Sequence, residues 1–353
     1  MQIIRYGVGL DMAMEKFDAC ISLIDIAQKV TVKAKRNFPN NAKGYQQFYK
    51  WVGTNCAIGF PIVYLMEATG IYHEGLACYM HSHDCSVSVI LPNKAKKYKQ
   101  ALGLRSKTDS IDAKSLSRMS CEQSLPTWVP MSKAIYLLRV MTRQIQSLTK
   151  DITRLKNQLH AQSFAMYKSS EVTKMLGQQL RLLQKQKDKL ETQILYILEN
   201  DPILNEKCEK ICRLKGLGRI SMAVIIAETN AFALFENISQ LVSYVGYDVI
   251  EDQSGKHKGK TKISKQGNGR IRRILHLPSF NVVRLNQQPF ANLYKRVYER
   301  SKIKMKAYTA VQKKLLIMVY TLWKRNEAFD PYYNQVEPSR EKEPVFSFAS
   351  ARQ

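Results

Sequence analysis

The segment from about residue 132 to 200 constrains the fold more than any other part of the chain, because it contains no proline and a single glycine, Gly177. Its apolar residues recur three and four positions apart, which is typical of helices that pack along a seam. They are Ile145, Leu148, Ile152, Leu155 and Leu159, then Leu176, Leu180, Leu183, Leu190, Ile194 and Ile197. We therefore expect two long helices, packed either as an antiparallel hairpin or as a coiled coil between chains.

The residues before this segment predict an α/β domain. Three short apolar runs, at 3–11, 17–25 and 29–38, are separated by gaps of turn length, as in an antiparallel meander. The expected elements that follow are a helix at 40–55, a strand at 62–68, a helix at 69–83, a strand at 85–92 that Pro92 ends, and basic helices at 93–103 and 109–123. This order is that of an RNase H-like sheet, in which the first and fourth strands are neighbours.

Two turn-rich points, PTWVP at 126–130 and Asp201-Pro202, mark boundaries. The fold class that we predict is α/β plus all-α. Its parts are an RNase H-like domain at 1–125, a helical coiled-coil region at 132–200, a mainly helical C-terminal domain at 201–328 and a polar tail at 329–353.

The charge balance points to nucleic acid. The chain has 55 Lys and Arg against 29 Asp and Glu, a formal net charge of +26. An excess of this size indicates a polyanionic partner, most commonly nucleic acid. No stretch approaches the roughly 18 apolar residues of a membrane-spanning helix, and the N-terminus lacks the layout of a signal peptide. We therefore expect an intracellular protein, cytoplasmic and nucleoid-associated, with no membrane partner.

Cysteine usage adds little chemistry. Seven scattered cysteines do not form a disulfide framework. Cys78, His81, His83 and Cys85 are residue types that suit zinc, but no second half with finger spacing follows. We favour a helix end with buried thiols over a zinc site.

Four acids stand out in so basic a chain. Asp11 ends the first apolar run and Glu67 ends the strand at 62–68, whereas Asp109 and Asp112 share one face of a helix start. Adjacent first and fourth strands would place Asp11 beside Glu67. Carboxylates gathered in this way repel one another unless Mg²⁺ or Mn²⁺ binds them, and a metal pair about 3.5–4 Å apart supports phosphoryl displacement. Each acid alone has a structural explanation, such as helix capping, but the set predicts a metal site.

A basic region lies at 253–273, which has eight Lys or Arg and no acid. We expect these eight to bind phosphates: Lys256, Lys258, Lys260, Lys262, Lys265, Arg270, Arg272 and Arg273. Ser254 opens the region, and the lone His257 beside it is weak grounds for an activating base. Upstream, Gly216 and Gly218 in LKGLGR suit either a phosphate-binding helix–hairpin–helix turn or a tight interhelical turn.

These motifs resemble a known family. GLD at 9–11, MEATGIY at 66–72 and SKTDSIDAKSL at 106–116 resemble the three motifs of the RuvC-like DEDD domain in transposases of the insertion-sequence family IS110, the bridge-RNA-guided recombinases. LKGLGRISMAVIIAE, FENISQLVSYVGY, QSG and ISKQGNGRIRRIL resemble the second domain of that family. The resemblance extends from about residue 5 to residue 325.

The resemblance implies that Asp11, Glu67, Asp109 and Asp112 are the metal-binding tetrad and that Ser254 is the nucleophile. It implies a site-specific recombinase that cuts and exchanges DNA strands through phosphoserine intermediates. Its partners would be donor and target double-stranded DNA and a structured non-coding bridge RNA. The active sites would be composite, in a homodimer or tetramer.

The chain departs from the family around the serine, where a second hydroxyl or glycine is common and this chain has DQSGK. Ser264 is the nearby competitor. Two other function classes stay open: a RuvC-like metal-dependent junction resolvase that uses water, and a non-catalytic nucleic-acid-binding protein. The target sequence, the guide RNA, the exact oligomer and the use of a circular donor are not encoded in any readable motif.

Overall fold

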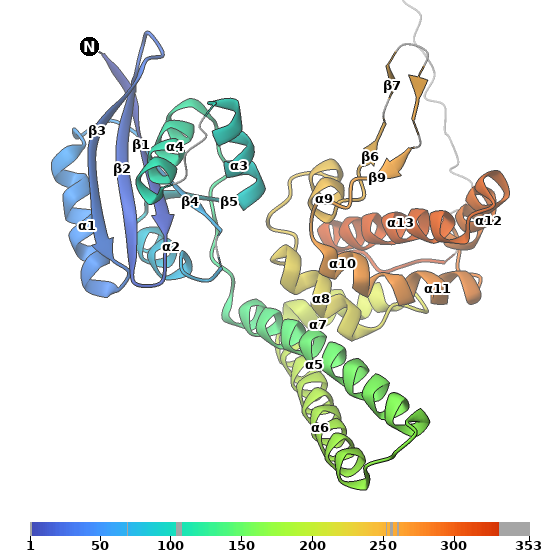
Figure 1. Cartoon of the computed structure of the whole chain (residues 1–353). Helices are drawn as coiled ribbons and strands as arrows, with labels where there is room; N and C mark the ends of the chain where they lie inside the picture. Colours follow the sequence, from blue (N-terminus) through green and yellow to red (C-terminus); the bar gives the residue numbers. More distant parts are fainter. Residues whose placement is uncertain are drawn as a thin grey trace, which may run out of the picture. The chain divides into compact units, whose positions relative to one another are not determined.

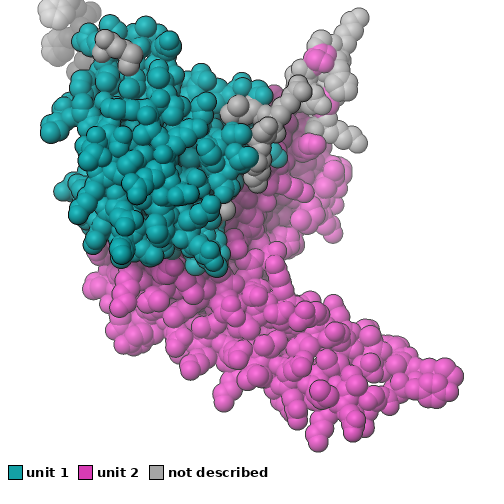
Figure 2. Space-filling model, turned by 60° about the vertical axis from the view of Figure 1, so that its left-hand side comes forward, with its two compact units in different colours: residues 1–130 teal, residues 131–353 magenta. Residues whose placement is uncertain are grey.

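The structure, a computed structural model, describes residues 2–68, 70–103, 108–251, 253–254, 257–259 and 261–331. It divides into two compact units, residues 1–130 and 131–353 (Figure 2).

The first unit is built on a five-stranded sheet of order β3-β2-β1-β4-β5 (Figure 1). Its strands are β1 (Ile3–Met12), β2 (Lys16–Asp25), β3 (Val30–Pro39), β4 (Ile62–Glu67) and β5 (Ser86–Ile90). The first three form an antiparallel meander, and β4 runs parallel to both β1 and β5. The expectation that the first and fourth strands are neighbours is confirmed, since Tyr6 to Leu10 pair in register with Ile62 to Met66.

The helices in the described residues of this unit are α1 (Ala42–Asn55), α2 (Glu74–His81), α3 (Pro92–Ala101) and α4 (Asp109–Glu122). Asn41 caps α1 and Thr108 caps α4, each through its side-chain oxygen. The expectation that Pro92 ends a strand is inexact, because Pro92 is the first residue of α3. A proline fits there since its fixed φ and missing N–H suit the first turn of a helix.

Small residues let α4 pack directly on β1 and β2. A Cβ added at Gly9 would lie 2.1 Å from the backbone N of Ser117 and 2.2 Å from the backbone O of Ala113. The Ser22 and Ser117 hydroxyls share a 2.8 Å hydrogen bond across the same interface. This close approach brings the first turn of α4 to the end of β1.

Exchanging Gly9 for alanine should therefore destabilise the first unit by about 3 kcal/mol or more, because backbone atoms of α4 occupy the space of the added methyl group. The matched control is Gly53→Ala in α1, where nothing lies within 4 Å of the added Cβ. That change should stabilise the helix by about 0.5–1 kcal/mol. Urea unfolding of both variants tests the opposite signs, and equal effects would contradict the packing account.

The second unit is mainly helical. Its helices are α5 (Lys133–Phe164), α6 (Ser170–Asn200), α7 (Pro202–Cys212), α8 (Arg219–Thr229), α9 (Ile238–Val245), α10 (Gly269–Ile274), α11 (His276–Arg284), α12 (Phe290–Ser301) and α13 (Lys304–Arg325). Between α9 and α10 lie four two-residue strands, β6 (Val249–Ile250), β7 (Gln253–Ser254), β8 (His257–Lys258) and β9 (Lys262–Ile263). They pair as β6 with β9 and β7 with β8, in a narrow ribbon (Figure 1).

Of the two arrangements left open for the long helices, the structure has the hairpin, in which α5 packs against α6 within the chain (Figure 1). The base of the hairpin shares one hydrophobic core with the helices that follow: Leu138 and Ile194 pack in the same cluster as Leu204 and Met222. The predicted division at residue 200 therefore does not separate two cores.

The end of the folded part also differs from the predicted boundary at residue 328. Phe329 is 6% exposed within the helical core, and its backbone N–H donates to the Lys210 carbonyl at 3.1 Å. The fold thus extends to at least Phe329, and most of the predicted tail, 332–353, lies outside the described residues. Within the described part, no helix is both long and apolar enough to cross a membrane.

Candidate functional site

Asp11 and Glu67 come together through strand pairing. Leu10 of β1 pairs with Met66 of β4 in the parallel ladder, and each acid is the next residue along its strand. Parallel register therefore places the two carboxylates at the same end of two adjacent strands. Both residues are half-buried.

Asp109 and Asp112 belong to the first turn of α4, which packs on β1 and β2. Asp109 is exposed, whereas Asp112 is buried with 7% of its surface accessible. The Asp112 Oδ2 atom lies 2.9 Å from the Lys99 Nζ atom of α3. Sequence reasoning missed Lys99, one of several lysines on a basic helix.

The other three acids affect the ionisation of Asp11. The pKa of Asp11 is raised from 3.8 to about 6, first by burial and then by the negative charges of Asp112, Asp109 and Glu67; Lys99 acts in the opposite direction. Three carboxylates, from β4 and from α4, thus act on a single side chain at the end of β1.

The chemistry of this acid cluster (Asp11, Glu67, Asp109 and Asp112) fits a divalent metal, since carboxylate oxygens are the ligands that Mg²⁺ and Mn²⁺ prefer. A further observation agrees: the buried Asp112 Oδ1 atom has no hydrogen-bond partner. However, across the described residues no three His, Cys, Asp or Glu side chains are gathered closely enough to hold an ion. The carboxylate ligands are therefore of the type that suits a divalent metal, but the side chains are not close enough together to coordinate an ion.

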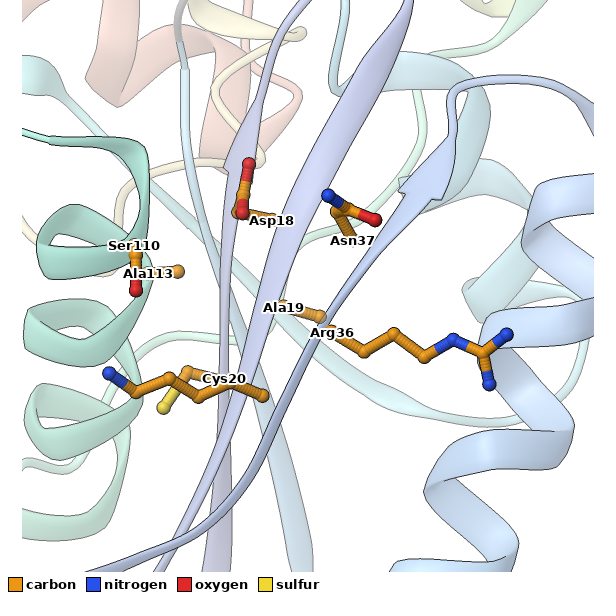
Figure 3. Close-up of a pocket in the computed structure, with 8 residues that line it drawn as sticks. Asp18, Ala19, Cys20, Arg36, Asn37, Ser110 and Ala113 are labelled. Carbon is orange, nitrogen blue, oxygen red and sulfur yellow. The ribbon is translucent and has the colours of Figure 1, made fainter.

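A hollow of about 290 Å³ lies between β2, β3 and α4. Asp18, which pairs directly with Asp11 across the β1–β2 ladder, lies in its wall. Figure 3 shows Asp18 next to Asn37, with Ser110 and Ala113 of α4 on the opposite side. Sequence reasoning missed Asp18, although strand alternation puts it on the same face as Asp11.

Ser254 lies in the ribbon, where β7 pairs with β8 and Ser254 pairs with His257. It is exposed. The sequence indicated a basic region here but no strands, because a two-residue strand is too short to give an alternating pattern. Of the neighbouring residues that we singled out, Lys256 and Lys260 lie outside the described residues, and only the backbone of His257 and Lys258 is described.

Ser264, the competing hydroxyl, has a different environment. Its Oγ atom donates to Asp248 Oδ1 at 2.5 Å, and its backbone N–H donates to the Asp248 carbonyl at 2.9 Å. Both bonds hold the base of the ribbon, so the Ser264 hydroxyl has a structural partner.

The described cations of the basic region fall into two groups. Lys262, Lys265, Arg270 and Arg273 are exposed, as phosphate binding requires. Arg272 differs, because its guanidinium donates to the Val245 carbonyl at the end of α9. A helix end leaves such carbonyls without helical partners, and this contact gives Arg272 a structural role.

The glycines of the LKGLGR turn also differ from each other. Gly216 has φ +110°, and an added Cβ would lie 3.0 Å from both Asn281 Cβ and Val282 N of α11, so it serves close packing. Gly218 begins α8 without a side-chain cap, and nothing lies within 4 Å of its added Cβ. The turn is thus a tight interhelical turn, one of the two predicted alternatives. The start of α8 is nevertheless open at Gly218.

Glu228 is a buried acid, and its sequence context predicted no role for it. Its carboxylate accepts from Arg143 at 2.8 and 3.1 Å and from Asn268 Nδ2 at 2.8 Å, and Arg270 lies 3.9 Å away. Burial opposes ionisation, but the bonds from Arg143 and Asn268 outweigh it and keep the pKa of Glu228 below its ordinary value. Asn268 also caps α10, so Glu228 fixes the start of the helix that carries the arginines.

A cavity of about 550 Å³ opens beside Glu228, between α5, α8 and α10. Apolar side chains such as Ile145 and Val224 line it together with Lys150, Arg270 and Arg273. These three cations lie around one hollow although α5 and α10 are far apart in sequence.

We expect Glu228→Gln to lower the free energy of unfolding by about 1–3 kcal/mol, because the amide replaces a buried charge-assisted pair of hydrogen bonds from Arg143 with weaker neutral ones. Thermal unfolding checks this, with Glu299→Gln on the exposed face of α12 as the control that should change little. If the two variants unfold alike, Glu228 does not organise this part of the fold.

The predicted alternative of a helix end holds for the Cys78–Cys85 cluster, but the thiols are not both buried. Cys78 is exposed and Cys85 is half-buried. His83 Nδ1 lies 2.8 Å from the Tyr79 carbonyl, a contact local to the end of α2. Cys78 faces solvent because the buried face of α2 is formed by Leu76, Ala77 and Met80.

Two family models describe this architecture. A DEDD transposase model of IS110 matches residues 8–162, and a model for transposases of the IS116/IS110/IS902 family matches residues 208–295. The acid cluster and the serine ribbon fall within the two matched regions. The protein is therefore a transposase, an enzyme that acts on DNA. The chain belongs to the IS110 family of transposases.

Two relatives match most of the chain. The chain is 26% identical over 326 residues to the pilin gene-inverting protein of Moraxella bovis. The aligned region covers 92% of this chain and 97% of that protein. The pilin gene-inverting protein of Moraxella lacunata gives the same identity and coverage.

Proposed function

We propose that this transposase is a site-specific recombinase in which the acid cluster and Ser254 cut and exchange DNA strands. The observation that carries the proposal is that Asp11 and Glu67 lie at the same end of β1 and β4, with Asp109 and Asp112 in the first turn of the helix that packs on β1. The sheet order supports an RNase H-like, specifically RuvC-like, first domain.

Asp11, Glu67, Asp109 and Asp112 would hold Mg²⁺, or Mn²⁺ in its place. Bound metal would supply charge neutralisation for the phosphate and for the departing oxygen. The chain's own residues have the other tasks. The acids would hold the cation that offsets their repulsion of the scissile phosphate, and the hollow with Asn37 and Ser110 in its wall lies next to Asp18, the strand partner of Asp11.

Ser254 would attack the phosphorus through its Oγ atom. A phosphoserine bond forms, the bond from phosphorus to one deoxyribose oxygen breaks, and the serine proton is replaced by a proton on the leaving hydroxyl, exchanged through solvent. Because one phosphodiester is exchanged for another, the reverse step joins strands without an external energy source. The ordinary pKa of a serine hydroxyl makes it a poor nucleophile, so the reaction depends on the phosphate being activated.

The cations of the basic region would bind the DNA and RNA backbones. Lys256, Lys258, Lys260, Lys262 and Lys265 are near Ser254 in sequence, and Arg270 and Arg273 follow on α10. Gly218 leaves the start of α8 open to a phosphate. Sequence would be read by a structured bridge RNA through base pairing with donor and target, as in other RNA-guided systems. The relatives' name, gene-inverting protein, fits exchange between two DNA sites.

The active site would be composite, with the acids of one subunit and Ser254 of another in a dimer or tetramer. Mixing an Asp11→Asn subunit with a Ser254→Ala subunit tests this directly. Composite sites predict that the mixture regains strand exchange, whereas sites within one chain predict none. Exchange in reactions with and without the RNA encoded beside the gene tests guidance in the same assay.

A further inference from the structure

The ion pair between Lys99 and Asp112 lies inside the acid cluster. The two side chains are only 19% and 10% exposed, and their charged atoms are 2.9 Å apart. Salt screens such a sheltered pair much less than it screens an ion pair on the surface. The charge of Asp112 is thus offset by a cation of the chain itself.

The two oxygens of Asp112 have unequal partners. Oδ2 contacts Lys99, whereas Oδ1 is buried without a hydrogen bond. Burying an acceptor without a partner costs free energy. Lys99 therefore offsets the charge of Asp112 but leaves one ligand oxygen unused.

The ion pair occurs together with an open site. Lys99 of α3 holds Asp112, and among the described residues no three His, Cys, Asp or Glu side chains are gathered closely enough for an ion. A lysine ammonium is a compact charge on a flexible stem, so it can leave one anion for another. A phosphate of bound DNA offers such an anion.

We propose, resting on the metal site of the proposed function, that Lys99 is a positioning residue that competes with the divalent metal for Asp112. In the absence of DNA the ammonium occupies Asp112 and keeps metal affinity low. When DNA binds, Lys99 moves to a backbone phosphate and Asp112 becomes free to complete the site. Metal and DNA binding are thereby coupled, and by linkage each strengthens the other.

The test measures Mn²⁺ binding to the full chain without DNA, from the spin-resonance signal of free Mn²⁺. Lys99→Met keeps an apolar stem and removes the charge, and we expect it to raise Mn²⁺ affinity by about tenfold or more, the effect of a unit charge within about 4–6 Å. Lys99→Arg keeps the charge and should bind like the unmodified protein. Lys97→Met, on the exposed face of the same helix, is the control for net charge and should bind as the unmodified protein does.

An unchanged or weaker affinity in Lys99→Met, with binding still lost in Asp112→Asn, would overturn the inference and leave the metal site standing. Absence of Mn²⁺ binding in every variant would overturn both this inference and the proposed metal site. A rise of equal size in Lys97→Met would show a general charge effect and would also overturn it.

A second arm uses DNA with a non-cleavable linkage at the exchange site. Bound DNA should raise Mn²⁺ affinity in the unmodified protein, and that gain should shrink in Lys99→Met because no ammonium remains to be drawn away. An equal gain in both proteins would contradict the transfer of Lys99 to a phosphate. A merely structural role for the pair would lower the melting temperature of Lys99→Met without changing Mn²⁺ affinity, which again contradicts the inference.

Discussion

Asp11→Asn should abolish strand cleavage and strand exchange, a loss of about 10³-fold or more, while the protein stays folded and still binds DNA. The amide removes a negative charge from the point at which the four acids converge. Cleavage of a labelled junction in Mg²⁺ measures the loss, and a filter-binding assay measures DNA affinity. Retained Mg²⁺-dependent cleavage would contradict the role of the acid cluster, and lost DNA binding would indicate a binding defect instead.

The same variant should be more stable than the unmodified protein when no metal is present. The pKa of Asp11 is about 6 in the fold and 3.8 ordinarily, so the folded state binds this proton more tightly than the unfolded state. On account of Asp11, the free energy of unfolding therefore falls as pH rises from about 3.8 to about 6 and stays lower above that. Asparagine removes this dependence. Urea unfolding at pH 5 and pH 7.5 in a chelator should show a smaller pH difference in Asp11→Asn, and a larger one would contradict the electrostatic account.

Ser254→Ala should abolish strand exchange by a similar factor, because no hydroxyl remains to hold the phosphate between cutting and joining. The matched control is Ser264→Ala, which loses the hydrogen bond to Asp248. It should lose about 1 kcal/mol of stability and keep exchange. The two outcomes separate a nucleophile from a structural hydroxyl in the same ribbon.

If Ser254→Ala cut DNA at the full rate, water would be the nucleophile and the protein would be a junction resolvase. If Ser264→Ala lost exchange instead, the roles of the two serines would be reversed. If Asp11→Asn and Ser254→Ala both kept full activity, neither domain would hold the catalytic groups.

Local sequence patterns were sufficient to predict most of the first domain. Short apolar runs separated by turn-length gaps indicated the strands, and the acids at the strand ends predicted that Asp11 and Glu67 lie side by side. This works because register in a sheet is set by which face is buried, so a residue's place at a strand end implies its neighbours. The long helices could also be predicted, since the three- and four-residue spacing of their apolar residues is a local property of the sequence.

The features that the sequence did not predict depend on contacts between residues far apart in the chain, which no local pattern encodes. Glu228 meets Arg143 from 85 positions away, and nothing in AVIIAE distinguishes its acid from one on the surface. Lys99 is one lysine among several on α3, and only the packing of α3 on α4 selects it. The ribbon around Ser254 is formed by strands of two residues, which are too short to show alternation. The core shared by α5, α6 and the C-terminal helices likewise depends on tertiary packing.

The most direct test of the central claim is the chemical identity of the intermediate. Unmodified protein is incubated with its RNA and a DNA substrate that carries a nick beside the exchange site, so that a short strand diffuses away after cleavage and rejoining is blocked. Protein-linked DNA is then isolated and digested, and the modified peptide is sequenced by mass spectrometry. The account predicts a nucleotide phosphate on Ser254, formed only with divalent metal and absent in Asp11→Asn. Cleaved strands with no attached protein, or a phosphate on any other residue, would contradict it.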